Sequence, residues 1–289
     1  NMITASIVKE LRDKTNAGMM DCKRVLAETN GDIDASIKLL RERGIAKAGA
    51  KADRAANEGV ITSRVNSSAT SGILLEVNCE TDFVSKNEQF QAFVGGIADA
   101  LAASDAVDHA AALALQYGEY NIDDTVKAEV VKVGENLQLR KYVRFDASAG
   151  GVIASYIHLG GKVGVLIEVG TTNPITAATD SFRELIRDLT LHIAASAPKG
   201  LSRDDIPTAI VDAEREIFRA RLAESGKPAN IIENILVGQI GKFFAESCFL
   251  EQGFVKDPDI TIAKLLEAKS KELNDTLTVT RFVRFGLGE

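Results

Sequence analysis

The 289-residue sequence contains no tryptophan, and cysteine, histidine and methionine occur three times each. Cys22, Cys79 and Cys248 are widely spaced and lack metal-ligand spacing. Free thiols in a reducing compartment are therefore expected rather than a disulfide framework. No apolar run approaches the roughly 18 residues that cross a membrane, and the first helix-like segment is amphipathic, unlike a signal peptide. These absences predict a cytoplasmic protein that does not bind a membrane.

Patterns that carry enzymatic chemistry are also missing. There is no glycine-rich loop ending in Lys-Ser or Lys-Thr, no zinc-type His/Cys spacing and no Gly-x-Ser-x-Gly elbow. His109, His158 and His192 are isolated, and a lone histidine is more often a surface or core residue than a catalyst. His192, on an apolar helix face, is expected to be structural, whereas His158, beside a predicted hairpin turn, could touch a partner. We expect no enzymatic activity, no cofactor, no metal and no direct nucleotide binding.

Positive charge is scarce outside the first segment of the chain. The net charge is −7, and residues 2–57 hold 11 Lys and Arg against 8 Asp and Glu, which leaves 23 against 33 in the remainder. Nucleic-acid-binding proteins usually concentrate Lys and Arg on one face. The acidic remainder therefore argues against nucleic-acid binding and favours a protein partner.

Three short helices are predicted in the first segment, at about 4–15, 20–29 and 33–43. Asn30-Gly31 ends the second helix, Asp32 can cap the third, and Gly44 is expected to end it. Residues 2–45 thus form a small three-helix bundle, and residues 46–57 form a helical or flexible linker that would let it sit apart. Met19 and Met20 cannot both face the interior of so small a bundle, so at least one is expected to be exposed for binding.

An internal repeat occupies the rest of the chain. Residues 59–104 reappear at 151–196 without insertion or deletion, a shift of 92 positions. Each copy is typical of strand, turn, strand and helix. A further strand at 137–145 resembles 277–285, at a shift of 140 positions. The repeat predicts an α+β protein with two duplicated subdomains, at 58–149 and 150–289.

The second copy contains additional residues that read as a helical hairpin, an insertion at about 204–248. Helices are predicted at 208–225 and 229–247, on either side of the helix-stopping turn Gly226-Lys227-Pro228. Two such helices would extend roughly 27 Å at 1.5 Å per residue. This arm either packs on itself or meets another molecule, and we expect it to support a homodimer.

One loop distinguishes the two copies: the first has Thr81-Asp82-Phe83-Val84 where the second has Asn173-Pro174-Ile175-Thr176. Phe83 either caps its own core or anchors another protein, and burial of an aromatic ring stabilises both arrangements equally well. Its absence from the second copy favours the anchor. Asp82 is either part of that contact or an ordinary turn or cap residue.

These residues resemble the family of bacterial elongation factor Ts over almost the whole chain. Residues 3–23, with Ala17-Gly18-Met19-Met20-Asp21-Cys22-Lys23, are similar to its ubiquitin-associated (UBA-like) module. Residues 76–84 are similar to its signature loop, and Gly134-Glu135-Asn136 to the motif before the closing strand of the first half. The resemblance implies a UBA-like module followed by two related α+β subdomains, with a coiled-coil insertion in the second.

The function that the resemblance implies is guanine nucleotide exchange on elongation factor Tu during translation elongation. The signature loop would disturb the magnesium and phosphate region of Tu and promote GDP release, so that GTP can rebind. His158 would contact another Tu domain. The expected loop contacts are Thr81, Asp82, Phe83 and Val84. Those expected in the UBA-like module, which would hold the nucleotide-binding domain of Tu, are Leu11, Arg12, Met19 and Met20.

The sequence departs from the family pattern at two places and leaves two other functions open. Asn16 stands where the family often has glycine, and many members continue past the position of Glu289 with a further helical module, whose contact is expected to be absent here. One alternative is a UBA-type binding adaptor without exchange activity. The other is an enzyme with a small-molecule site between the subdomains, for which the sequence offers no set of polar residues.

Overall fold

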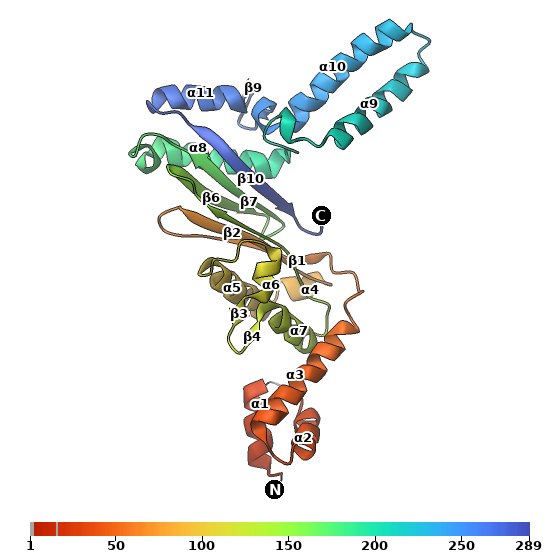
Figure 1. The fold of residues 1–289 in the computed structure, drawn as a ribbon, viewed down its shortest axis with the longest axis vertical. Coiled ribbons are helices and arrows are strands. Elements are labelled where there is room, and N and C mark those ends of the chain that lie inside the picture. Colours follow the sequence, from red (N-terminus) through yellow and green to blue (C-terminus); the bar gives the residue numbers. More distant parts are fainter. Residues whose placement is uncertain (1–2, 16) are drawn as a thin grey trace.

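The computed structural model describes residues 3–15 and 17–289, so Asn16 and the predicted module start at Met2 lie outside the described residues. The chain is a mixed α+β protein with helices at its N-terminal end and antiparallel sheets after them. Figure 1 shows an elongated molecule, with these helices at one end, two sheets in the middle and a helical arm at the other end. Within the described ranges, no helix is long and apolar enough to cross a membrane.

The N-terminal helices are α1 (Ala5–Thr15), α2 (Met19–Glu28) and α3 (Ile33–Gly49). Asp32 caps α3 as predicted, because its Oδ1 accepts a hydrogen bond from the Ala35 amide at 2.9 Å. The buried core of this module comprises Val8, Leu11, Cys22, Val25 and Leu26.

The prediction that Gly44 ends α3 is wrong, because the helix continues to Gly49. Its second half packs along α7 (Ile122–Val133), where Arg41 pairs with Asp124 at 3.2 Å. A Cβ at Gly44 would lie only 3.6 Å from the Val131 side chain. Packing against α7 therefore outweighs the roughly 1 kcal/mol that glycine costs inside a helix. The N-terminal helices are consequently joined to the first sheet region by the packing of α3 on α7.

The first sheet has the order β1-β2-β5, formed by β1 (Glu58–Val65), β2 (Ser71–Cys79) and β5 (Gln138–Asp146). Its outer face is covered mainly by α5 (Glu88–Ala102), as the apolar spacing predicted. Four short elements complete this half: α4 (Asp82–Ser85), α6 (His109–Ala114), β3 (Gln116–Tyr117) and β4 (Tyr120–Asn121).

The second sheet has the equivalent order β6-β7-β10 and is formed by β6 (Gly151–His158), β7 (Val163–Gly170) and β10 (Thr278–Gly286). Val60 pairs with Val77 in the first hairpin, and Val152 pairs with Val169 in the second, so the register recurs 92 positions later. Its outer face is covered by α8 (Asp180–Ser196). The remaining elements of this layer are η1 (Thr176–Ala178), β8 (Gly253–Phe254), β9 (Asp257–Thr261) and α11 (Ile262–Glu272).

The two sheets pack against each other through their inner faces. The Ile61 amide donates to the Gly161 carbonyl at 2.9 Å, and the Ile153 amide donates to the Ala69 carbonyl at 2.8 Å. Both pairs follow the 92-residue shift, which makes the contact nearly symmetric. The buried side chains of this interface also come in matching positions from the two sheets: Ile61, Leu74 and Phe145 with Ile153, Leu166 and Phe285.

The predicted helical hairpin is confirmed as α9 (Thr208–Ala223) and α10 (Ala229–Ser247), which extend away from the sheets in Figure 1. Gly226 has a φ of 70° in the turn between them, a conformation that glycine adopts without strain. The base of the arm has a small buried cluster that includes Phe243 and Cys248. Two short helical turns flank the hairpin, η2 (Arg203–Asp205) and η3 (Phe249–Glu251).

Candidate partner-binding site

The loop after β2 directs Phe83 away from the protein. Thr81 caps α4, and its hydroxyl accepts a hydrogen bond from the Val84 amide at 3.4 Å. Val84 packs against the core of the first half, whereas the Phe83 side chain is 84% exposed. Phe83 therefore does not cap its own core, and the exposed anchor is the alternative that matches the structure. Asp82 is not the cap residue, and its carboxylate pairs at the surface with Lys86 at 3.2 Å.

A carboxylate from a distant part of the sequence holds this loop in place. Glu135 Oε2 accepts hydrogen bonds from the Glu80 amide at 2.9 Å and the Thr81 amide at 3.1 Å, and Oε1 accepts from the Thr81 hydroxyl at 2.6 Å. In the sequence, Glu135 stands out only as part of the family motif Gly134-Glu135-Asn136. The 140-residue shift of the repeat aligns Glu135 with Asp275, so a carboxylate occurs at this position in both halves. That recurrence could have pointed to a structural role for Glu135.

Asp275 holds the corresponding loop of the second half in the same way. Its carboxylate accepts from the Thr172 amide at 2.8 Å and the Asn173 amide at 3.0 Å. Burial alone would raise the pKa of Asp275, but hydrogen bonds from the Thr176 and Thr172 hydroxyls and from these amides lower it. Ile175, 92 positions after Phe83, is 69% exposed. Each half thus presents one apolar side chain on a loop fixed by a carboxylate.

The Cys79 thiol lies at the base of the first loop but is not a reactive group. Its side chain is buried, and Sγ donates to the Thr81 carbonyl at 3.2 Å. Burial raises the pKa of Cys79 to about 12, and the nearby Glu135 charge acts in the same direction. Because the thiolate is the nucleophilic form, Cys79 serves as a packing residue.

In the N-terminal module, three of the four expected contact residues lie on the surface. Met19 and Met20, in the first turn of α2, are 49% and 74% exposed, so both side chains are available rather than only one. Arg12 is exposed on α1. Leu11 is fully buried in the core of the module with Val8, so its side chain cannot meet a partner directly. Leu11 is a core residue of the module.

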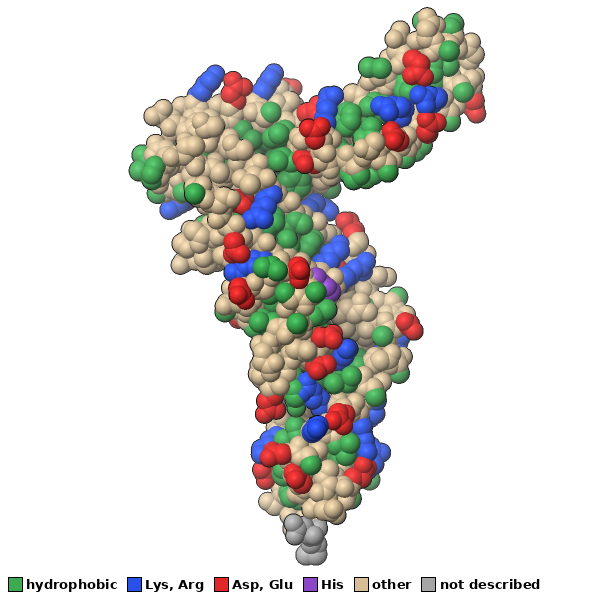
Figure 2. Space-filling view, in the orientation of Figure 1, with side chains coloured by type: hydrophobic (Ala, Val, Ile, Leu, Met, Phe, Trp, Pro, Cys, Tyr) green, Lys and Arg blue, Asp and Glu red, His purple; other side chains and the backbone are tan. Residues whose placement is uncertain are grey.

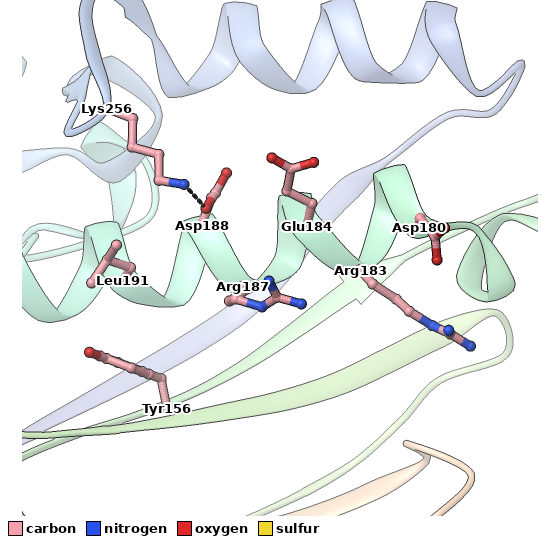
Figure 3. A pocket seen from close by; sticks show the side chains of 8 residues that line it. All are labelled: Tyr156, Asp180, Arg183, Glu184, Arg187, Asp188, Leu191 and Lys256. Atoms are coloured by element: carbon pink, nitrogen blue, oxygen red, sulfur yellow. Dashed lines mark ion pairs between the residues drawn. The ribbon is translucent and has the colours of Figure 1, made fainter.

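His158 lies at the end of β6, half-buried, with its Nδ1 2.6 Å from the Tyr156 hydroxyl. Tyr156 borders a pocket of about 570 Å³ between β6 and α8. Figure 3 shows Arg183 and Arg187 extending from α8 into this region, beside the ion pair of Asp188 with Lys256, which spans 2.7 Å. The surface beside Tyr156 and His158 thus carries one aromatic ring among charged groups of both signs.

The arrangement fits the binding of a large partner. Lys and Arg are interspersed with Asp and Glu over the face seen in Figure 2, which shows no broad basic surface. Throughout residues 3–15 and 17–289, no group of three or more His, Cys, Asp or Glu side chains could hold a metal ion. The candidate contacts lie on α1, α2, α4 and β6, which are spread along the length of the molecule (Figure 1).

Comparison with known proteins assigns the family. Residues 80–289 match the family described as elongation factor TS. The chain is similar to elongation factor Ts of Syntrophotalea carbinolica, with 45% identity over 99% of this chain and 93% of the relative. It is also similar to elongation factor Ts of Thioalkalivibrio sulfidiphilus, with 44% identity over 99% and 92%, respectively. For the protein of that name from Clostridium perfringens, identity is 42% over 100% and 94%. The chain belongs to the elongation factor Ts family.

Proposed function

We propose that this protein releases GDP from elongation factor Tu by pressing the preformed loop of Thr81 to Val84 against the nucleotide site of Tu. As a member of the elongation factor Ts family, it is a guanine nucleotide exchange factor in translation elongation and not itself an enzyme. The observation that carries the loop assignment is Phe83, which is 84% exposed although its loop is fixed at both ends. Burial of such a ring in a partner stabilises the complex by about 1.5–3 kcal/mol.

The mechanism requires no general base from this chain. An exchange factor binds the nucleotide-free state of its partner more tightly than the nucleotide-bound state, and the coupling is reciprocal. A coupling of about 3 kcal/mol corresponds to roughly 150-fold in affinity. Phe83 would act as a wedge. The Asp82 carboxylate would disturb the groups that hold the magnesium ion in the nucleotide site of Tu. Displacement of that cation removes the charge that neutralises the phosphates of GDP.

Asp82 is free to take this role at little cost. Its ion pair with Lys86 joins two exposed side chains on one helical turn. Exposed pairs of this kind contribute only about 0.2–0.5 kcal/mol. The Asp82 carboxylate can therefore exchange Lys86 for a group of the partner when the complex forms.

The other contacts would hold the partner while the loop acts. Arg12, Met19 and Met20 would bind the nucleotide-binding domain of Tu, and His158 would bind another Tu domain. In this proposal residues 2–45 form the UBA-like module, 46–57 the linker, and 58–149 and 150–289 two duplicated core subdomains. The recurring strand register supports the duplication. The protein would work in the cytoplasm, where translation takes place.

Self-association through the arm is a separate proposal. The hairpin, a coiled-coil insertion at about 204–248, exposes several apolar side chains on both helices, which a second copy of the chain could cover. Those side chains are Ile210, Ile217, Ile231 and Val237. Homodimerisation would then leave Phe83 and the N-terminal module free for Tu.

Stopped-flow release of a fluorescent GDP analogue from elongation factor Tu tests the proposed function. We expect the protein to accelerate release in a saturable manner. An adaptor that used only the UBA-like module would bind Tu in a pull-down without changing the release rate. Binding with an unchanged rate would therefore contradict the proposal.

A further inference from the structure

We infer that Glu135 is a positioning residue for nucleotide exchange, which holds the loop of Thr81 to Val84 in its active conformation without touching the partner. This inference rests on the proposed function of Phe83. Its geometric basis is the set of three hydrogen bonds from Glu80 and Thr81 to the Glu135 carboxylate, 2.6–3.1 Å long. Hydrogen bonds to a charged acceptor are stronger than neutral ones.

The Glu135 carboxylate supplies acceptors that the local chain does not. Two of its donors are consecutive backbone amides just past the end of β2, where ladder pairing with β5 has stopped at Asn78. The third donor is the hydroxyl of Thr81, which also caps α4. One side chain therefore fixes the direction in which the chain leaves the sheet and the cap residue of the helix that bears Phe83.

The turn at residues 134–136 also connects this loop to the segment that follows α3. Glu80 Oε1 accepts from the Asn136 amide at 2.8 Å, and its Oε2 pairs with Arg54 at 2.7 Å. The Asn136 side-chain amide donates to the Arg54 carbonyl at 2.7 Å, and Lys51 Nζ donates to the Gly134 carbonyl at 2.7 Å. This turn thus contacts both the loop that bears Phe83 and the segment that follows the N-terminal helices.

Two contacts would still hold the loop near its place without Glu135. Val84 packs against the core, and Thr81 can still cap α4. Loss of the carboxylate would therefore leave Phe83 exposed but variable in position, and the complex would have to order it on binding. The maximal rate of GDP release should fall, whereas affinity carried by Arg12, Met19 and Met20 should change little.

The duplication provides a matched control. Asp275 holds the loop of Ile175 through the equivalent amides of Thr172 and Asn173. That loop has no role in the proposed exchange. Asp275→Ala therefore removes a comparable clamp and should leave GDP release at the wild-type rate.

The test measures the maximal rate and half-saturating concentration for release of a fluorescent GDP analogue from Tu. We expect Glu135→Ala to lower the maximal rate about tenfold with little change in half-saturation, since small misplacements of a contact cost up to roughly 100-fold. Glu135→Gln keeps the size and one acceptor oxygen and should lose less. If Glu135→Ala fails to fold by circular dichroism, Glu135→Gln alone decides, and a wild-type rate in it overturns the inference.

A double-mutant cycle separates positioning from general stability. Because Glu135 acts through the loop that carries Phe83 and Asp82, Glu135→Ala (or Glu135→Gln, should the alanine variant not fold) should slow release less in the Phe83→Ala background than in the wild type. Full additivity of the two losses would overturn the inference, as would a wild-type rate in the Glu135 variants. A wild-type rate in Phe83→Ala alone would instead reject the proposed function.

Discussion

The three histidines of this protein have different surroundings. His109 Nε2 lies 2.7 Å from the Leu139 carbonyl, and His158 contacts the Tyr156 hydroxyl at the end of β6. His192 is buried, as predicted for a structural residue. Its Nδ1 accepts from the Val255 amide at 3.1 Å, so its Nε2 carries the proton and donates to Gln252 at 2.8 Å. This bonding pattern requires the neutral ring.

His192 should make stability depend on pH. Burial lowers its pKa below the usual value of about 6.5, and the hydrogen bond to Gln252 only partly opposes this. As the pH falls below about 6.5, the unfolded chain binds a proton that the folded chain resists, so stability is lost. We expect wild type to lose more of its free energy of unfolding than His192→Gln between pH 7 and pH 5. Urea unfolding at both pH values measures this, and parallel losses in the two proteins would contradict it.

Leu11 and Phe83 show what the sequence could and could not predict about single side chains. The resemblance assigned a contact to Leu11, but it lies one helical turn after Val8, and both fill the small core. For Phe83 the comparison of the two repeats favoured exposure, which the structure confirms. The two copies share the apolar positions that form their cores. An aromatic residue found in only one copy is therefore a candidate for an exposed position.

At the level of elements, the predicted strands and helices were found, and the errors occurred where tertiary contacts decide. The predicted stop of α3 at Gly44 followed local glycine propensity, whereas α7, some 80 positions later, stabilises the helix through to Gly49. The clamp by Glu135 was missed for a similar reason. Its donors lie more than 50 positions earlier in the chain.

The α9–α10 hairpin allows a direct test of self-association. At its base, Ile206 and Cys248 lie in one small buried cluster, so residues 208–247 can be replaced by a short linker. We expect light scattering to give the mass of a dimer for the wild type and of a monomer for the deletion variant. A double substitution, Ile217→Lys with Val237→Lys, should act in the same direction because both side chains are exposed. Equal masses for all three proteins would exclude a dimer through this arm.

At the scale of the whole molecule, the repeat predicted two similar halves but not how they meet. The middle strands β2 and β7 are buried along most of their length, which indicates cover on both faces. Their nearly continuous apolar sequences contained this information. What the repeat could not provide is the symmetric contact itself, in which the hydroxyls of Ser63 and Ser155, 92 positions apart, are 2.8 Å from each other.

Nucleotide release is expected to depend on Phe83 and not on other exposed apolar side chains such as Ile175. The measurement is stopped-flow release of a fluorescent GDP analogue from elongation factor Tu by wild type, Phe83→Ala and Ile175→Ala. Loss of a central aromatic contact of about 2 kcal/mol corresponds to roughly 30-fold. We predict a loss of that size for Phe83→Ala and a wild-type rate for Ile175→Ala, with both variants folded. Release by Phe83→Ala at the wild-type rate would contradict the account.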